Sequence, residues 1–294
     1  MKLLERLTQY EKLMRLDKPI GILLLLWPTL WAVWIASNGK PAWMVVWIFA
    51  LGTVLMRSAG CVMNDYADRN FDPHVARTKE RPLAAQRVST REALTLAAVL
   101  SIAAFLLIIR FNKLTWIIAA IALFLAASYP FTKRFLAIPQ AYLGIAFGFG
   151  IPMAFAAISG AIPPVAWVLL LANVFWAIAY DTEYAMVDRD DDIKIGIHSS
   201  ALLFGSYDVI AVVISHLLAL ALLIVAGIML DFGIFYYAGL LAAAWFVGFQ
   251  YRLIKRRDTA QCFEAFLNNK WVGGMVFAGI VAQYYFSGMF GRGL

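Results

Sequence analysis

The chain has 294 residues, of which 63% are hydrophobic and only 15% are charged. Its mean hydropathy of +0.76 excludes a soluble globular domain, in which about a quarter of the residues are charged. The formal net charge of +7 requires no nucleic-acid partner, because an uneven distribution of Lys and Arg across a membrane accounts for it.

The first sixteen residues, MKLLERLTQYEKLMRL, predict an amphipathic helix. Leu3, Leu7, Tyr10 and Met14 recur at helical spacing on one side, and the other side is polar or charged. These charges exclude the apolar core of a cleavable signal peptide. We expect residues 1–16 to lie in the membrane interface, with binding of a partner as the alternative.

Apolar stretches of about 20 residues follow, each long enough to cross a bilayer. Helices are the expected form, because lipid offers no hydrogen-bond partners to the backbone. The sequence predicts nine spans, at residues 20–37, 42–62, 92–110, 114–130, 138–158, 164–182, 207–229, 233–251 and 271–290. The polar connections are short or moderate in length, so residues 1–294 are expected to form one all-α integral membrane domain.

The basic residues predict the orientation of these spans. With nine spans, the N-terminus and every second loop share one side of the membrane, which carries 20 of the 25 Lys and Arg residues. The positive-inside rule predicts that this side faces the cytoplasm, including segments 63–91, 131–137 and 183–206. No targeting segment is recognisable, which favours a bacterial inner membrane.

A first acidic cluster follows the second span, in the stretch NDYADRNFD. It contains Asn64, Asp65, Asp68 and Asp72. If the helix of the second span continues, Asn64, Asp68 and Asp72 lie at i, i+4 and i+8 and share one face.

A second acidic cluster closes the sixth span, in the stretch YDTEYAMVDRDDD. Asp181, Tyr184 and Asp188 lie at i, i+3 and i+7, and Asp192 follows one turn later. A solvated loop is the simpler explanation of acidic residues, but it does not explain the helical spacing within both clusters.

Carboxylates this close repel one another, and their pKa values rise unless a cation lies between them. Oxygen donors without His or Cys suit Mg²⁺, which takes one or two carboxylates together with substrate phosphates. The two clusters therefore predict a site for Mg²⁺ and a diphosphate. Its expected metal ligands are Asn64, Asp68, Asp72, Asp188 and Asp192.

Several side chains on the same side of the membrane are candidates for binding the diphosphate. They are Tyr129 and Lys133, one helical turn apart, together with Arg77, Arg81 and Lys194. Each cation is also explained as a positive-inside anchor. Arg57 differs, because a charge within a span is costly and marks a functional site.

Three stretches of the sequence resemble the 4-hydroxybenzoate polyprenyltransferases, the ubiquinone-biosynthesis branch of the UbiA superfamily. They are DKPIGILLLLWPTLWA, AGCVMNDYADRNFDPHVARTKERPL and YDTEYAMVDRDDDIKIGIHS, and the resemblance covers nearly the whole chain. The NDxxDxxxD motif of the superfamily falls on Asn64, Asp65, Asp68 and Asp72. Its second aspartate motif falls on Asp188 and Asp192, and its YxxxK element on Tyr129 and Lys133.

The resemblance implies nine helices around a central cavity open to the cytoplasm, dependence on Mg²⁺, and a long-chain polyprenyl diphosphate as donor. The expected reaction ionises the donor, and the ring of 4-hydroxybenzoate attacks the allylic cation ortho to its hydroxyl group. The expected catalytic residues are Asp68, Asp72, Asp188, Asp192 and Lys133. The expected substrate-binding residues are Asn64, Arg57, Arg77, Arg81, Tyr129, Arg134, Asp181, Tyr184 and Lys194.

The carboxylate of the acceptor needs a cation, for which Arg134 is the first choice and Arg57 the second. Asp188 is the candidate base for the ring proton. The polyprenyl tail is expected in an apolar groove that opens sideways to the lipid bilayer, and no nucleic acid is expected as a partner.

Two alternatives to this function remain. A prenyltransferase with another acceptor, such as a dihydroxynaphthoate, homogentisate, haem or a chlorophyllide, would share the aspartate motifs. A secondary transporter would also combine many spans with a few buried charges, but its site would lie near the bilayer midplane on broken helices.

Overall fold

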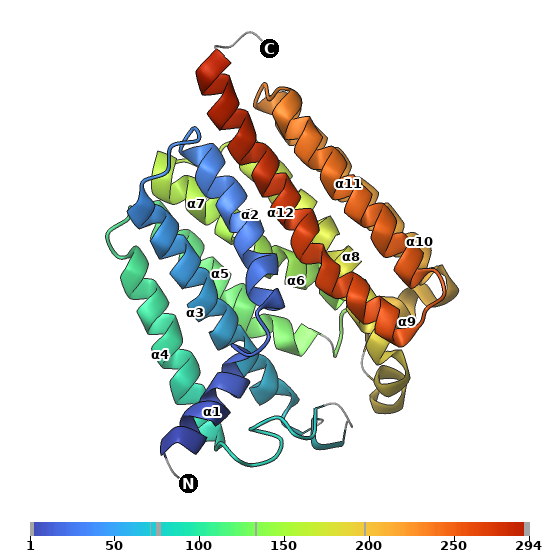
Figure 1. Ribbon diagram of the computed structural model, residues 1–294. Coiled ribbons are helices and arrows are strands. Elements are labelled where there is room, and N and C mark those ends of the chain that lie inside the picture. The colour runs from blue at the N-terminus through green and yellow to red at the C-terminus, as the bar shows by residue number, and fades with distance from the viewer. Residues whose placement is uncertain (1–2, 71, 75–77, 133, 197, 291–294) are drawn as a thin grey trace.

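The computed structural model describes residues 3–70, 72–74, 78–132, 134–196 and 198–290, and these residues form helices and loops without a β-strand (Figure 1). The α-helices are α1 (Leu3–Met14), α2 (Ile20–Ala36), α3 (Trp43–Asp68), α4 (Thr90–Ile108), α5 (Lys113–Thr132), α6 (Pro139–Gly148), α7 (Gly150–Ser159), α8 (Pro164–Ile195), α9 (Ser200–Phe204), α10 (Asp208–Met229), α11 (Ile234–Ile254) and α12 (Thr259–Phe290). The expected all-α fold is confirmed.

Seven helical segments of the described chain are long and apolar enough to cross a membrane. They are Trp43–Asp68, Thr90–Ile108, Lys113–Thr132, Pro139–Ser159, Pro164–Lys194, Ser200–Met229 and Ile234–Ile254. The predicted first span falls on α2, which has only 17 residues, and the predicted ninth lies within α12, which is not among the seven. Length and apolarity therefore support an integral membrane protein and identify seven candidate spans in the described part of the chain, where the sequence predicts nine.

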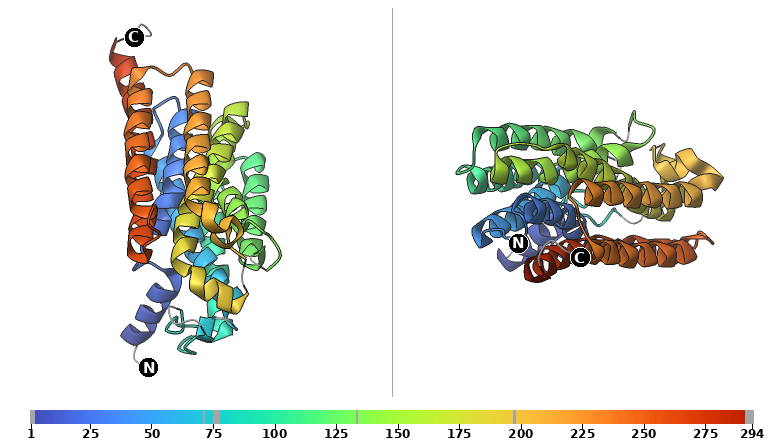
Figure 2. Two further views of the ribbon diagram at one scale, coloured as in Figure 1. Left: turned by 90° about the vertical axis from the view of Figure 1, so that its right-hand side faces the viewer. Right: turned by 90° about the horizontal axis from the view of Figure 1, so that it is seen from above.

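The two ends of the bundle differ in what they carry. Helix α1 and the connection between α3 and α4 lie at one end, and the C-terminal end of α12 lies at the other (Figures 1 and 2).

Helices α3 and α8 are longer than a bilayer requires. A helix rises 1.5 Å per residue, so α3 with 26 residues is about 39 Å long and α8 with 32 residues about 48 Å. Both exceed the roughly 30 Å of a bilayer's hydrocarbon core, and both end in their aspartate motifs.

The predicted fifth span is divided into two helices. Helix α6 ends at Gly148 and α7 begins at Gly150, two residues before Pro152. Proline lacks the N–H that would bond the carbonyl of residue 148, so the break follows from the sequence. Gly144 packs against α8, where a Cβ atom would lie only 2.8 Å from the Cα of Val174. The glycines of this span therefore serve helix packing.

Candidate active site

A cavity of about 1280 Å³ lies within the bundle, lined by residues of α1 to α8 and α12. Its polar part contains both predicted acidic clusters. The acidic and amide side chains that line it include Asn64, Asp65, Asp68, Asp72, Asp181, Asp188, Asp191 and Asp192. The cationic side chains that line it are Lys12, Arg15, Lys18, Arg57, Arg81 and Lys270. The fold thus brings together two motifs that are more than a hundred residues apart in the sequence.

The first aspartate motif is positioned partly by a helix and partly by a turn. Asn64 and Asp68 lie on the last turn of α3, and the Nδ2 atom of Asn64 donates to Oδ2 of Asp68 over 3.1 Å. The condition under which Asn64, Asp68 and Asp72 would share one helical face is not met. Helix α3 ends at Asp68, and Asp72 is the first residue of a 3₁₀ turn. The carbonyl of Asp72 accepts a hydrogen bond of 3.0 Å from the Thr78 hydroxyl. The connection folds back and returns Asp72 to the cavity.

Asp65 is held by two arginines that come from different segments. Its Oδ1 atom lies 2.6 Å from Nη2 of Arg15 and 3.2 Å from Nη1 of Arg81, and the residue is 1% exposed. The same Arg81 atom donates to Oδ2 of Asp72 over 2.9 Å. Burial raises the pKa of the Asp72 carboxyl above its ordinary value, whereas Arg81 acts in the opposite direction. Asp65 therefore links the segment that follows α1 to the connection between α3 and α4.

The second aspartate motif is carried by an unbroken helix. Helix α8 continues to Ile195, so Asp181, Tyr184, Asp188 and Asp192 keep their helical spacing, and all four line the cavity. The ring of Tyr184 packs on that of Phe266 of α12, with 4.9 Å between the ring centroids. The prediction that these residues share a face is confirmed by their common place in the cavity.

The predicted cations fall into three groups. Arg57 and Arg81 line the cavity, together with the predicted Tyr129. Arg77 and Lys133 lie outside the described residues. Two others do not line the cavity. Arg134 donates from Nη2 to the Ala67 carbonyl over 2.9 Å, and the exposed Lys194 lies 3.2 Å from Oδ1 of Asp191.

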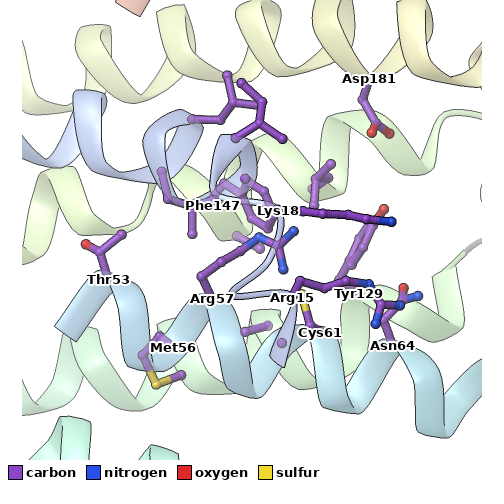
Figure 3. Close-up of a pocket in the computed structure, with 18 of the residues that line it drawn as sticks. Arg15, Lys18, Thr53, Met56, Arg57, Cys61, Asn64, Tyr129, Phe147 and Asp181 are labelled. Carbon is purple, nitrogen blue, oxygen red and sulfur yellow. The ribbon is translucent and has the colours of Figure 1, made fainter. Parts of the chain in front are cut away.

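Arg57 projects from the middle of α3 into the cavity, on the same helix as Asn64 and towards the segment that carries Lys18 (Figure 3). Its guanidinium group lies against Gly21 of α2, where a Cβ atom would come within 2.7 Å of Cζ. The Nε atom of Arg57 is buried and has no hydrogen-bond partner among the described residues. A buried guanidinium with an unused donor is suited to receive an anion.

Four cations that line the cavity were not predicted as site residues from the sequence. Lys12 lies on α1, Arg15 and Lys18 lie between α1 and α2, and Lys270 lies on α12. All four were counted only as positive-inside residues. The position of Arg15 and Lys18 beside the first span, at the end where the aspartates lie, was the available signal.

Between α3, α4 and α5 the cavity is mainly apolar. Helices α3, α4 and α5 line this part with small and aliphatic side chains, among them Met56, Ala104, Ile108, Ala119 and Leu123. The cavity therefore combines a charged part with an apolar part, as a diphosphate with a hydrocarbon chain requires.

The donor atoms fit a hard cation that is shared with a substrate. Within the described part of the chain, no three His, Cys, Asp or Glu side chains lie close enough together to hold a metal ion by themselves. The oxygen donors of the two aspartate motifs that face the cavity are carboxylates and the amide of Asn64. Mg²⁺ binds such donors in ones and twos while phosphate oxygens and water complete its shell.

The sequence of the chain matches the UbiA prenyltransferase family over residues 25–279. It is 64% identical to a 4-hydroxybenzoate octaprenyltransferase of Thiobacillus denitrificans, over 97% of each chain. It is 63% identical to the protein of the same name from Nitrosospira multiformis, over 97% of this chain and 98% of that one.

The fold is also similar to solved structures. The apo structure of a UbiA homolog from Aeropyrum pernix K1 matches 88% of this chain and 97% of its own, with a TM-score of 0.78 and 25% identity. A UbiA homolog from Archaeoglobus fulgidus bound to DMAPP and Mg²⁺ matches 94% of this chain and 98% of its own, with a TM-score of 0.60 and 17% identity. With a family match over most of its length and relatives of this similarity, the chain belongs to the UbiA prenyltransferase family.

Proposed function

We propose that this protein transfers a polyprenyl group from polyprenyl diphosphate to the ring of 4-hydroxybenzoate, ortho to the hydroxyl group, in ubiquinone biosynthesis. One observation carries the proposal. Aspartate motifs on α3 and α8 line one cavity that also has a long apolar part. Full-length relatives named 4-hydroxybenzoate octaprenyltransferase support the choice of acceptor.

The donor diphosphate binds in the charged part of the cavity. The residues that hold Mg²⁺ there are Asn64, Asp68, Asp72, Asp188 and Asp192. When bound, Mg²⁺ neutralises charge on the diphosphate and so makes it a better leaving group. Arg81, Tyr129, Asp181 and Tyr184 bind the donor beside them, and Arg77, Lys133 and Lys194 belong to the same proposed set.

Bond changes at the donor and the acceptor balance. The allylic C–O bond breaks, and diphosphate keeps the electron pair. A new C–C bond forms to the ring, and the ring proton leaves to a base, for which Asp188 is our candidate. The surrounding helices exclude water, which would otherwise trap the allylic cation.

Arg57 receives the carboxylate of 4-hydroxybenzoate. A carboxylate in a water-poor cavity needs a paired cation, and Arg pairs with it in a bidentate manner. Arg57 lines the cavity with a buried donor to spare. Arg134, which the sequence favoured, bonds the Ala67 carbonyl outside the cavity lining. Arg57 is therefore the first candidate for the carboxylate of the acceptor, and Arg134 is the second.

The proposed topology has nine transmembrane helices, with the cavity open to the cytoplasm of a bacterial inner membrane. Helices α2 and α12 supply the first and ninth spans. The placement of α1 and the end of α12 at opposite ends of the bundle supports an odd number of crossings (Figure 1). The excess of basic residues at the end that carries the aspartates supports the orientation.

The test is an assay in membranes that contain the protein. Membranes supplied with a polyprenyl diphosphate, Mg²⁺ and 4-hydroxybenzoate should form the 3-polyprenyl product, and 1,4-dihydroxy-2-naphthoate should give much less. Product from the naphthoate alone would assign another acceptor. No product from any acceptor, together with protein-dependent uptake of a solute, would favour the transporter.

A further inference from the structure

A second polar cluster lies behind the cavity, where α8, α10 and α12 meet. Glu183, His216 and Asn269 are 0%, 2% and 0% exposed. The Nδ2 atom of Asn269 donates to Oε2 of Glu183 over 2.7 Å, and Trp176 Nε1 donates to Oδ1 of Asn269 over 2.9 Å. The Nε2 atom of His216 lies 3.8 Å from Oε1 of Glu183. Ionisable residues within a span are expensive, so this cluster requires an explanation.

These four residues do not line the cavity, and the proposed reaction does not use them. The Oε1 atom of Glu183 and the Nε2 atom of His216 have no hydrogen-bond partner among the described residues. The cost of burying them is offset only by their proximity to each other and by the bond to Asn269.

Asn269 holds two points on the same face of α8. Trp176 and Glu183 are seven residues apart, which is close to two full turns. A side chain of α12 that bonds both positions resists rotation of α8 about its own axis. The indole of Trp31 extends this contact, because it stacks on Trp176 with 5.7 Å between ring centroids and donates to the Gly273 carbonyl over 3.0 Å.

The rotation of α8 sets the direction of the second aspartate motif. At about 100° per residue, Asp188 lies about 130° and Asp192 about 170° around α8 from the face held by Asn269. At the side-chain radius of a helix, a rotation of 20° moves a group by about 2 Å. Mg²⁺ demands near-ideal geometry with short bonds of about 2.0–2.1 Å, so a displacement of this size is not tolerated.

We propose that Glu183, through Asn269 and His216, is a positioning residue that fixes the rotation of α8 and thereby aims Asp188 and Asp192 at the metal–diphosphate site. This inference rests on the proposed function, since it assigns a role towards that site. Arg189 pairs with Asp208 further along α8 and supplies a second attachment. Loss of Glu183 therefore weakens the site without abolishing it.

The test compares Glu183→Leu and the conservative Glu183→Gln with a matched control, Gln250→Leu. Gln250 is 1% exposed and donates to Asn268 over 3.1 Å, which makes a buried hydrogen bond between α11 and α12 without α8. Purified proteins in detergent would be titrated with Mn²⁺ in the presence of inorganic diphosphate, with bound Mn²⁺ measured by electron paramagnetic resonance. Thermal unfolding would be measured in parallel.

Glu183→Leu should raise the Kd for Mn²⁺ about fivefold and lower kcat about tenfold, with the KM for 4-hydroxybenzoate within twofold of the wild-type value. Glu183→Gln keeps an acceptor for Asn269 and should restore most of both losses. Gln250→Leu should lower the unfolding temperature without changing Mn²⁺ binding. If Glu183→Leu does not accumulate, Asn269→Leu removes both anchor points of α8 and should give the same shift.

Mn²⁺ binding that is unchanged in folded Glu183→Leu and Asn269→Leu would overturn the inference, and so would an equal change in Gln250→Leu. If the wild-type protein itself binds no Mn²⁺ with diphosphate, the proposed function fails, and this inference fails with it. Wild-type binding together with unaltered variants would leave the proposed function intact and reject only the role of Glu183.

Discussion

The space occupied by the Arg57 guanidinium exists because residue 21 has no side chain. The two groups face each other across α2 and α3, and a Cβ atom at residue 21 would overlap the guanidinium group. The guanidinium is the far end of a flexible side chain, so it would move rather than force the helices apart. Gly21 is therefore part of the proposed acceptor site although it bonds to nothing in it.

Arg57→Ala should raise the KM for 4-hydroxybenzoate at least about tenfold, or about 1.4 kcal/mol, because the acceptor carboxylate loses its cation. The KM for the prenyl donor should hardly change. Gly21→Ala should give a smaller defect of the same kind by displacing Arg57. Saturation curves for each substrate measure both effects.

Arg134→Ala is the matched control for this prediction. Its guanidinium bonds a backbone carbonyl outside the cavity lining, so the KM for the acceptor should stay near the wild-type value. An acceptor-selective defect in Arg134→Ala, with a normal Arg57→Ala, would return the carboxylate site to Arg134.

Asp68→Asn and Asp188→Asn should each lower kcat by about 100-fold or more, about 3 kcal/mol, because each removes a proposed ligand of Mg²⁺. EDTA should abolish turnover in the wild-type protein. Asp190→Asn is the control, since Asp190 is exposed and does not line the cavity. Full activity in EDTA would contradict the role of the metal, and equal losses in all three variants would show a general effect of charge.

At this scale the sequence predicted the second motif well and the first only in part. Spacing predicts a shared face wherever the helix is continuous, as for Asp181 to Asp192 in α8. Helical spacing did not place Asp72, because α3 ends four residues earlier, at Asp68. Asp72 also precedes Pro73, and a residue before proline avoids the α-helical region. The order of Arg57 and Arg134 was not predictable, because the direction of a side chain at the end of α5 depends on packing against α3.

At the scale of the helix, α1 packs against α3, a contact that the predicted interfacial position did not include. The side of α1 that packs against the bundle is formed by Tyr10, Leu13 and Met14, which contact Val62 and its neighbours. Leu7, which the sequence predicts on the same side as Tyr10 and Met14, is instead 53% exposed, and Leu4 is 79% exposed. Polar contacts add to this packing, because Arg6 pairs with Glu92 and Arg15 with Asp65.

Arg15→Ala should lower the thermal unfolding temperature in detergent more than Arg87→Ala does. Arg15 pairs with a carboxylate that is 1% exposed, and loss of a charged partner from a buried group costs about 1.5–3 kcal/mol. Arg87 pairs with Glu80, whose side chain is 69% exposed, and such surface pairs contribute about 0–1 kcal/mol. Equal shifts would mean that Asp65 is satisfied by Arg81 alone.

The sequence located the helices closely but not their interruptions. The predicted spans fall on α2 to α12. The aspartate motifs in the sequence indicated where α3 and α8 extend beyond their apolar parts. The break between α6 and α7 lies inside the single predicted span 138–158. A proline in the sequence does not tell whether neighbouring helices re-form the lost hydrogen bond. Gly150, at this break, lies against Thr29 of α2. Such a contact between helices is likewise not predictable from the local sequence.

At the scale of the whole molecule, the charge distribution predicts which end of the bundle faces the cytoplasm. In a background without Cys61 and Cys262, a cysteine at position 79 should resist a membrane-impermeant thiol reagent added to intact spheroplasts, and a cysteine at position 40 should react. Lys79 and Lys40 lie on opposite sides in the nine-span topology. Labelling at position 79 would invert the proposed orientation.

The contacts of α1 also impose an order on biosynthesis. This helix leaves the ribosome first, yet its polar partners, Asp65 and Glu92, are translated 50 and 86 residues after Arg15 and Arg6. Helix α1 and the segment after it can therefore make these contacts only once α3 and the start of α4 have been synthesised. The end of the cavity that contains Asp65 can then assemble before α5 to α8 and α12, which line the rest of the cavity, have left the ribosome.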